Sequence, residues 1–468
     1  MSERARIGRQ IAKGAAWAVL MRFVIRMLGF FSTIILARLL TPDDYGVIAL
    51  AMVFVGLMDA LTWFGFEVAL IQDQHAPLAK YHTVWTLTVI RGVLLASLIL
   101  LGASMFAEVF DEPRLNVILQ VLACGTLIDG FASTGIVDFR KNFEFDRDFT
   151  AMVIPRLAGF FITVALAVIW RNYWAMAVGM VATKLVAMAV GYAMHSYRPR
   201  FSMEYWREVF SFSKWLLANS VLRYGYNRGD AMILGKIAGS QALGVYTVAD
   251  EISNMVLTEL VAPIQRALLP GYAKLTQIKD GLRDAYLTVF AITVTFALPI
   301  AVGVALTADL FVPLLLGDQW LQTIPLIRIL CVCGMLHIGV ASSGAVYVAS
   351  GKPWLTAVLY TISLLAGLPL IAWGAMQAGA IGAAWGMVGM SILFVTVNSR
   401  LIGRTLALAP GDILRRRLRP ILAAFAMAAI ALALRRQLPV ADGAVIQATR
   451  PHCRWGIAHT VSKTFLSG

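Results

Sequence analysis

A run of polar side chains recurs on one face of an otherwise apolar stretch. Asn219, Arg223, Asn227 and Asp230 follow each other at steps of three or four residues, and Arg228 lies beside them. An α-helix places residues with this spacing on one face. Guanidinium groups bind phosphate oxygens in a bidentate manner, and the bond strengthens where water is excluded. The stripe therefore predicts an anion-binding surface that faces a water-filled cavity.

Two further arginines, Arg22 and Arg26, lie one helical turn apart near the start of the chain, with Gly29 and Thr33 following on the same face. A charge at membrane depth costs about 2.5–3.5 kcal/mol, so each such charge needs a reason. Arg26 and Arg22 are expected to line the same cavity as the polar stripe. Arg22 could instead extend toward the membrane surface.

Carboxylates accompany these arginines. The candidates for ion coupling are Asp59, Asp230, Asp250 and Glu251. They could bind protons or sodium ions, or they could neutralise the arginines, and the sequence does not choose between these roles. No cofactor and no metal site is expected beyond possible H⁺ or Na⁺ coupling.

The elements that carry these residues are predicted to be membrane-spanning helices. Hydrophobic residues make up 59% of the chain and charged residues 14%, whereas soluble domains are about 45–50% apolar and about 25% charged. The apolar runs are about 20 residues long, which is the length that crosses a bilayer as a helix. Twelve spans are predicted at 15–38, 46–68, 83–107, 115–137, 150–170, 173–194, 212–236, 244–269, 285–307, 321–348, 354–376 and 379–402, with a short thirteenth at 420–434.

Lysine and arginine collect in every second connection, on the side that holds the amino terminus. The alternate connections of the first twelve spans hold about four, near Arg38, Arg114, Arg171 and Lys236. This positive-inside bias predicts a multi-pass protein of the bacterial inner membrane with a cytoplasmic amino terminus. It also accounts for most of the net charge of +14, so nucleic-acid binding is not expected.

The chain contains an internal repeat. Ile34–Ala51 aligns without a gap to Met232–Ala249, and Cys124–Val137 aligns to Cys333–Val346. Equivalent spans match in both cases, as in transporters built from two halves. We therefore expect an all-α protein with two lobes of six helices each and the substrate path between them. The predicted units are an amino-terminal lobe (1–200), an amphipathic linker (201–212) and a carboxyl-terminal lobe (213–405).

Residues 406–468 form the fourth predicted unit: a basic cytoplasmic loop, the short thirteenth span and a polar tail from Arg450 to Gly468. The tail is rich in Arg, His, Ser and Thr and holds no apolar run long enough to cross a membrane. An altered or frameshifted carboxyl end is expected.

Several segments resemble one transporter family. The segments ILARLLTPDDYGVIALA (35–51), GFEVALIQ (65–72), NRGDAMILGKIAGSQALGVYTVADEI (227–252), LLPGYAKL (268–275) and ASGKP (349–353) are similar to those of Wzx-type polysaccharide flippases. These belong to the multidrug/oligosaccharidyl-lipid/polysaccharide (MOP) exporter superfamily. The resemblance implies alternating-access translocation of undecaprenyl-diphosphate-linked oligosaccharide for exopolysaccharide or lipopolysaccharide synthesis. It implies two six-helix lobes in a V around a central cavity. That cavity would be lined by Arg22, Arg26, Arg223 and Arg228, with Asp59, Asp230 and Asp250 nearby.

The partners implied are the lipid-linked oligosaccharide and membrane lipids, and a polysaccharide polymerase and export machinery are further candidates. The protein is not expected to be an enzyme. A membrane glycosyltransferase or polymerase is the alternative from that class, since Asp146 and Asp148 form an Asp-x-Asp pattern, but no large loop supports it. A cation-coupled multidrug antiporter is the alternative within the superfamily, and the paired arginines argue against it. A structural scaffold is disfavoured by the repeat and the charged spans.

Overall fold

The computed structural model describes residues 3–408, except for 74, 143, 257–267, 269–271, 273–274, 276–277, 279, 339 and 341. Every regular element within these residues is helical. Several consecutive long helices pack against each other as antiparallel pairs: α4 with α5, α7 with α8, and α11 with α12. The elements are α1 (Glu3–Leu39), α2 (Pro42–Thr62), α3 (Phe66–Gln72), α4 (Leu78–Val109), α5 (Arg114–Gly130), η1 (Thr134–Ile136), α6 (Val137–Lys141), α7 (Phe145–Trp170), α8 (Trp174–Met194), α9 (Trp206–Val256), α11 (Gly281–Phe311), η3 (Val312–Leu316), η4 (Asp318–Trp320), α12 (Thr323–Ile338), α13 (Ser343–Ala349) and α14 (Trp354–Leu406).

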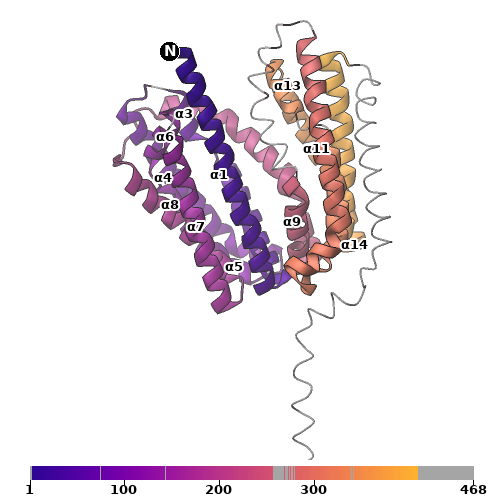
Figure 1. The fold of residues 1–468 in the computed structure, drawn as a ribbon. Coiled ribbons are helices and arrows are strands. Elements are labelled where there is room, and N and C mark those ends of the chain that lie inside the picture. The colour runs from indigo at the N-terminus through magenta and orange to yellow at the C-terminus, as the bar shows by residue number, and fades with distance from the viewer. Residues whose placement is uncertain are drawn as a thin grey trace, which may run out of the picture.

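Two groups of helices flank α9 (Figure 1). Helices α1 and α4 to α8 lie on one side, and α11, α13 and α14 lie on the other. The groups approach each other at the end of α1 opposite the amino terminus and diverge toward the amino terminus. We call the first end the closed end. Helix α9 joins the two groups because it packs against α2 on one side and against α12 and α14 on the other.

The chain is a multi-pass membrane protein, as the sequence predicts. In the described part of the chain, eight helices are long and apolar enough to cross a membrane, and a ninth is added if α5 and the bent segment after it form one span. Eleven of the twelve longer predicted spans fall on helices, and the span at 244–269 does so as far as residue 256, beyond which most of it lies outside the described residues. The number of crossings stays a prediction, and the thirteenth span at 420–434 lies outside the described residues, as does the polar tail.

Helix breaks subdivide several predicted spans. The span predicted at 46–68 ends at Thr62, and α3 begins after Gly65, whose φ of 63° is left-handed. Helix α9 covers two predicted spans and bends at Gly239, with φ of 81°. Helix α14 also covers two, with non-helical angles at Ala378 and Gly379. Glycine adopts positive φ without a Cβ clash, which explains why these turns need no longer loop.

The breaks also follow the internal repeat. Helix α5 ends at Gly130 and η1 begins at Thr134, while α12 ends at Ile338 and α13 begins at Ser343. The alignment of Cys124–Val137 with Cys333–Val346 makes Thr134 the equivalent of Ser343. The two halves of the sequence therefore interrupt their equivalent helices at the same place.

The predicted linker at 201–212 is divided between an extended segment and the start of α9 at Trp206. The extended segment lies along α4, where the backbone N–H of Ser202 donates to Thr86 Oγ1 at 3.0 Å. The start of α9 is held by Lys80, whose side chain is 4% exposed and lies 2.7 Å from a Glu208 carboxylate oxygen. Phe201 and Trp206 are exposed, which is the amphipathic character that the sequence predicts. The boundaries of the linker and of the two lobes stay predictions.

Candidate functional site

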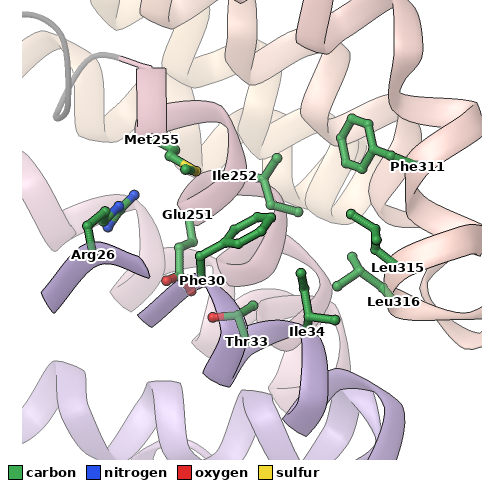
Figure 2. Close-up of a pocket in the computed structure, with 10 residues that line it drawn as sticks. All are labelled: Arg26, Phe30, Thr33, Ile34, Glu251, Ile252, Met255, Phe311, Leu315 and Leu316. Carbon is green, nitrogen blue, oxygen red and sulfur yellow. The ribbon is translucent and has the colours of Figure 1, made fainter. Parts of the chain in front are cut away.

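A cavity of about 40 Å³ lies where α1 meets α9 and the end of α11. Figure 2 shows Arg26 and Phe30 on α1 facing Glu251 and Met255 on α9, with Phe311 on the far side. The remaining lining residues are Thr33, Ile34, Ile252, Leu315 and Leu316. The wall is mostly apolar, so the two charged side chains interact in surroundings that hold little water.

Glu251 connects the two helices across this cavity. Its carboxylate accepts a hydrogen bond from the Thr33 side chain and interacts electrostatically with Arg26 and Arg228. Arg26 and Thr33 share the cavity-facing side of α1 because they are seven residues, or about two helical turns, apart. The structure thus brings Arg26, one of the two arginines on α1, together with Glu251, one of the carboxylates that the sequence singles out for ion coupling.

Two more carboxylates lie next to this pair, on the two limbs of α9. Asp230 is 6% exposed and accepts hydrogen bonds from the Tyr246 hydroxyl at 2.7 Å and from the Ala231 N–H at 2.8 Å. Asp250 accepts from Asn254 Nδ2 at 2.5 Å and interacts electrostatically with Asp230. The bend at Gly239 lets the limbs run side by side, so residues far apart on one long helix become neighbours.

The cluster formed by Arg26, Arg228, Asp230, Asp250 and Glu251 can perform two kinds of chemistry. The guanidinium groups can bind an anion when a carboxylate releases them. The repulsion between Asp230 and Asp250 is relieved when a proton or a cation binds to either one. Because Arg228 interacts with both Asp250 and Glu251, an anion bound at this arginine would compete with the two carboxylates.

Among the other predicted site residues whose side chains the structure describes, none forms a hydrogen bond or an ion pair with this cluster. Arg223 and Asn227 are exposed, and Arg223 lies within electrostatic reach of Tyr360 on α14. Arg22 is partly exposed on the turn of α1 before Arg26. The side chain of Asn219 lies outside the described residues. Asp59 forms an ion pair with a residue of its own group of helices, Arg91 of α4.

Sequence reasoning missed two residues that the structure places in polar surroundings at membrane depth. Tyr246 is fully buried and bonds to Asp230, but a lone tyrosine in an apolar run gives no signal of that partner. Arg156 lies midway along α7 and lines a second, larger cavity. A count of charges within the predicted span 150–170 would have found it.

The closed end is held by contacts that are reciprocal between the halves. The repeat aligns Pro42 with Ser240 and Gly46 with Gly244. A Cβ on Gly46 would lie 1.7 Å from the Ser240 carbonyl oxygen, and one on Gly244 would lie 1.8 Å from the Pro42 carbonyl oxygen. Each glycine thus lets its own backbone contact the backbone of the other half. The two halves therefore join about an approximate twofold axis.

Two equivalent cations extend this reciprocity. Arg38 donates to the carbonyl oxygen of Leu315 at 2.8 Å, in the turn after α11. Lys236, which the repeat aligns with Arg38, lies 3.1 Å from a carboxylate oxygen of Asp111, in the turn after α4. Each of these side chains therefore connects one half of the sequence to a turn in the other half. Ser240 adds a hydrogen bond of 2.5 Å to Asp43.

Comparison with known proteins decides the family. A family model described as "Polysaccharide biosynthesis protein" matches residues 35–325, which is more than half of the chain. The chain belongs to the polysaccharide biosynthesis protein family. The match covers α2 to α9 and all of α11, and it includes Arg228, Asp230, Asp250 and Glu251. The resemblance to polysaccharide flippases drawn from the sequence segments is confirmed.

Members of the polysaccharide biosynthesis family are found among curated relatives. The chain is 25% identical over 388 residues to the lipopolysaccharide biosynthesis protein WzxC of Escherichia coli strain K12, covering 81% of this chain and 78% of the relative. It is 23% identical over 439 residues to the teichuronic acid biosynthesis protein TuaB of Bacillus subtilis strain 168, covering 91% and 89%.

Two solved structures of other proteins have the same fold as this member of the polysaccharide biosynthesis family. The lipid II flippase MurJ in an inward closed conformation matches with a TM-score of 0.70 at 12% identity, covering 88% of this chain and 92% of that one. An inward-facing multidrug resistance MATE family transporter of the MOP superfamily matches with a TM-score of 0.62 at 15% identity, covering 83% and 98%. The predicted fold class, an all-α polytopic membrane protein, is confirmed within the described residues, and the V of two six-helix lobes stays a prediction.

Proposed function

We propose that this protein is a flippase that translocates undecaprenyl-diphosphate-linked oligosaccharide across the bacterial inner membrane by alternating access. The observation that carries the proposal is the cluster of Arg26 and Arg228 with Glu251 and Asp250 between α1 and α9. A diphosphate is a strong bidentate partner for guanidinium groups. It competes with the carboxylates for the same arginines, and the released carboxylates then take up H⁺ or Na⁺.

The relatives support this assignment. Two of them are named for lipopolysaccharide and teichuronic acid biosynthesis, and the flippase with the same fold is named for lipid II. A multidrug antiporter with a cationic substrate fits less well, because such a substrate offers no group for the guanidinium groups of Arg26 and Arg228 to bind. The pathway would require a glycan polymerase and export machinery as partners downstream of the flipped substrate.

Alternating access needs one closed and one open end. With the amino terminus in the cytoplasm, as the distribution of lysine and arginine favours, the closed end faces the periplasm. The conformation is then the one that accepts substrate from the cytoplasm. The lobes 1–200 and 213–405 would move about the linker 201–212, with Arg22, Arg223, Asn219 and Asn227 nearer the cytoplasmic entrance than the cluster and Asp59 braced by Arg91.

The test is Arg26→Gln in a strain whose own gene is deleted. Substitution removes the cation that faces Glu251 while keeping a polar side chain, so surface polysaccharide should fall by about tenfold or more, the effect of one lost charge-assisted hydrogen bond. The matched control is Arg171→Gln, an exposed arginine at the end of α7. Surface polysaccharide should be unchanged in the control, and membrane abundance should be equal in both. Normal polysaccharide in the Arg26→Gln strain would contradict the proposed function.

A further inference from the structure

A second cavity, of about 610 Å³, lies among α1, α2, α5, α7 and α8. We call it the amino-terminal chamber. It lies on another side of α1 from the charged cluster, because α1 turns Leu28, Gly29 and Ser32 toward the chamber and Arg26 and Phe30 toward the cluster. Its volume is in the range of about 300–1,000 Å³ that is usual for ligand sites. The proposed headgroup site does not use it.

The chamber contains three charged side chains at membrane depth. Lys184 Nζ lies 2.9 Å from Asp129 Oδ2, and both side chains are about half exposed, at 47% and 46%. Arg156 is exposed and lines the same chamber. It has no hydrogen-bond or ion-pair partner within the part of the chain that the structure describes. A guanidinium midway along a membrane helix is costly unless it meets water or an anion.

Close packing of α7 on α8 fixes how these charges are arranged. A Cβ on Gly159 would lie 1.9 Å from Thr183 Oγ1, and one on Gly179 would lie 1.9 Å from Thr163 Oγ1. The antiparallel helices are therefore in register at Gly159 with Thr183. Arg156 is one turn from Gly159 and Lys184 follows Thr183, so the two cations lie at nearly the same height.

The balance of charge selects an anion as the ligand. Asp129 neutralises Lys184 at 2.9 Å, so the chamber keeps the unpaired charge of Arg156. A metal ion or drug cation would meet that charge and would have to displace Lys184 from Asp129. The hydroxyl groups of Thr126 and Thr163, which also line the chamber, are suitable partners for sugar hydroxyls.

We propose that the amino-terminal chamber receives an acidic sugar of the translocated oligosaccharide, with Arg156 binding the carboxylate. This inference rests on the proposed function, because the sugar is carried next to the diphosphate that the cluster on the other side of α1 binds. The chamber then discriminates among glycans, while the cluster binds the part that all substrates share. Arg156 is a specificity-determining residue.

The experiment uses the full chain in lipid nanodiscs and two soluble probes that differ by one carboxylate. Calorimetric titration compares cellobiouronic acid, a glucuronic-acid disaccharide, with cellobiose. The protein should bind the acid at least tenfold more tightly. Arg156→Gln should abolish that preference, since a hydrogen bond to a charged group is worth a factor on the order of ten to a hundred. Arg156→Lys should retain part of it, and Arg171→Gln should retain all of it.

Equal binding of the two probes by the unmodified protein would overturn the inference, and so would an unchanged preference in Arg156→Gln. Native mass spectrometry gives the third test. If Arg156→Gln loses only the phosphatidylglycerol that the unmodified protein retains, the chamber is a site for bilayer lipid and the inference is wrong. If Arg156→Gln does not fold, Lys184→Gln replaces it, because removal of that cation leaves no net positive charge in the chamber and should also abolish the preference. Surface polysaccharide in the Arg26→Gln strain tests the proposed function separately. If polysaccharide is lost in that strain while Arg156→Gln still prefers the acid, the inference about the chamber is wrong and the proposed function stands.

Discussion

Asp250 and Asp230 are neighbours on the two limbs of α9, yet their surroundings differ. Asp230 is held by Tyr246 and by a backbone N–H, while Asp250 has the side chain of Asn254. Asp250 also interacts with Arg228 and Glu251. Asp250 thus lies within electrostatic reach of Asp230, Glu251 and Arg228 together, and this position suits it to transmit the binding of an ion to the anion site.

We therefore predict that Asp250→Asn reduces the dependence of transport on an ion gradient. The amide has nearly the same shape but binds neither a proton nor the arginine charge, so proteoliposomes with and without a proton or sodium gradient should translocate substrate at similar, low rates. Asp318→Asn, at an exposed position in η4, is the matched control and should keep the full gradient dependence. Gradient dependence that persists in Asp250→Asn would remove this residue as a coupling site.

At the same scale, the limits of sequence reasoning are clear from particular pairs. The spacing of Arg22 and Arg26 places them on one side of α1, and it led to Arg26 beside Glu251. It could not show that Asp59 pairs with Arg91, because the partner lies on another helix and the choice depends on how α2 packs on α4. Nor could it find the bond of Tyr246 to Asp230, which exists only because α9 folds back at Gly239.

Among the elements, the turn before α2 and the bend of α9 are equivalent in sequence but reach the same geometry by different means. Thr41 caps α2, and its hydroxyl accepts from the Asp44 N–H at 3.2 Å while Asp44 accepts from the Thr41 N–H at 2.9 Å. Its equivalent, Gly239, has a positive φ and no side chain. In both arrangements, a glycine five residues later meets the backbone of the other half.

We predict that Gly244→Ala weakens the closed end. The added Cβ would lie 1.8 Å from the Pro42 carbonyl oxygen, a backbone atom that cannot rotate away, so α2 and α9 must separate. Overpacking of this kind costs about 1–3 kcal/mol, and thermal unfolding in nanodiscs should show it as a lower melting temperature. Gly303→Ala is the control, since no atom lies within 4 Å of its added Cβ. Equal melting temperatures for the two variants would show that the halves do not meet at Gly244.

Helical elements were the most predictable part of the fold. Runs of apolar residues long enough to cross a bilayer indicated each long helix that the structure describes. Their interruptions were less predictable, because a break such as the one at Gly65 requires a single left-handed residue inside an apolar run. The internal repeat was the exception, since its alignment of Thr134 with Ser343 coincides with two breaks that composition alone would not reveal.

For the whole molecule, the closed end decides which side of the membrane the cluster meets. The pair of Lys236 and Asp111 crosses between the two groups of helices, with side chains 48% and 85% exposed. Exposed pairs of this kind are worth about 0.2–1 kcal/mol. That is small for folding, but it shifts an equilibrium between two conformations severalfold when their free energies are close.

We predict that Lys236→Glu favours the conformation open at this end. The glutamate repels Asp111, and the second change Asp111→Lys should restore attraction and the original distribution. Spin labels at positions 171 and 318, one on each group of helices near this end, would report the change as a longer distance in double electron–electron resonance. A distribution identical in Lys236→Glu and in the double variant would show that the pair does not control opening.

The paired glycines at the joint of α2 and α9 also bear on ancestry. Because each half offers the same backbone surface to the other, a half-length chain bearing that surface would be complementary to a second copy of itself, as in an isologous dimer. After fusion of two copies of the gene, the dimer interface would have become the joint between the two halves of one chain. The two equivalent cations later diverged, since Arg38 now donates to carbonyl oxygens and Lys236 pairs with a carboxylate. The contact of Lys236 is therefore sensitive to acid and salt, whereas that of Arg38 is not.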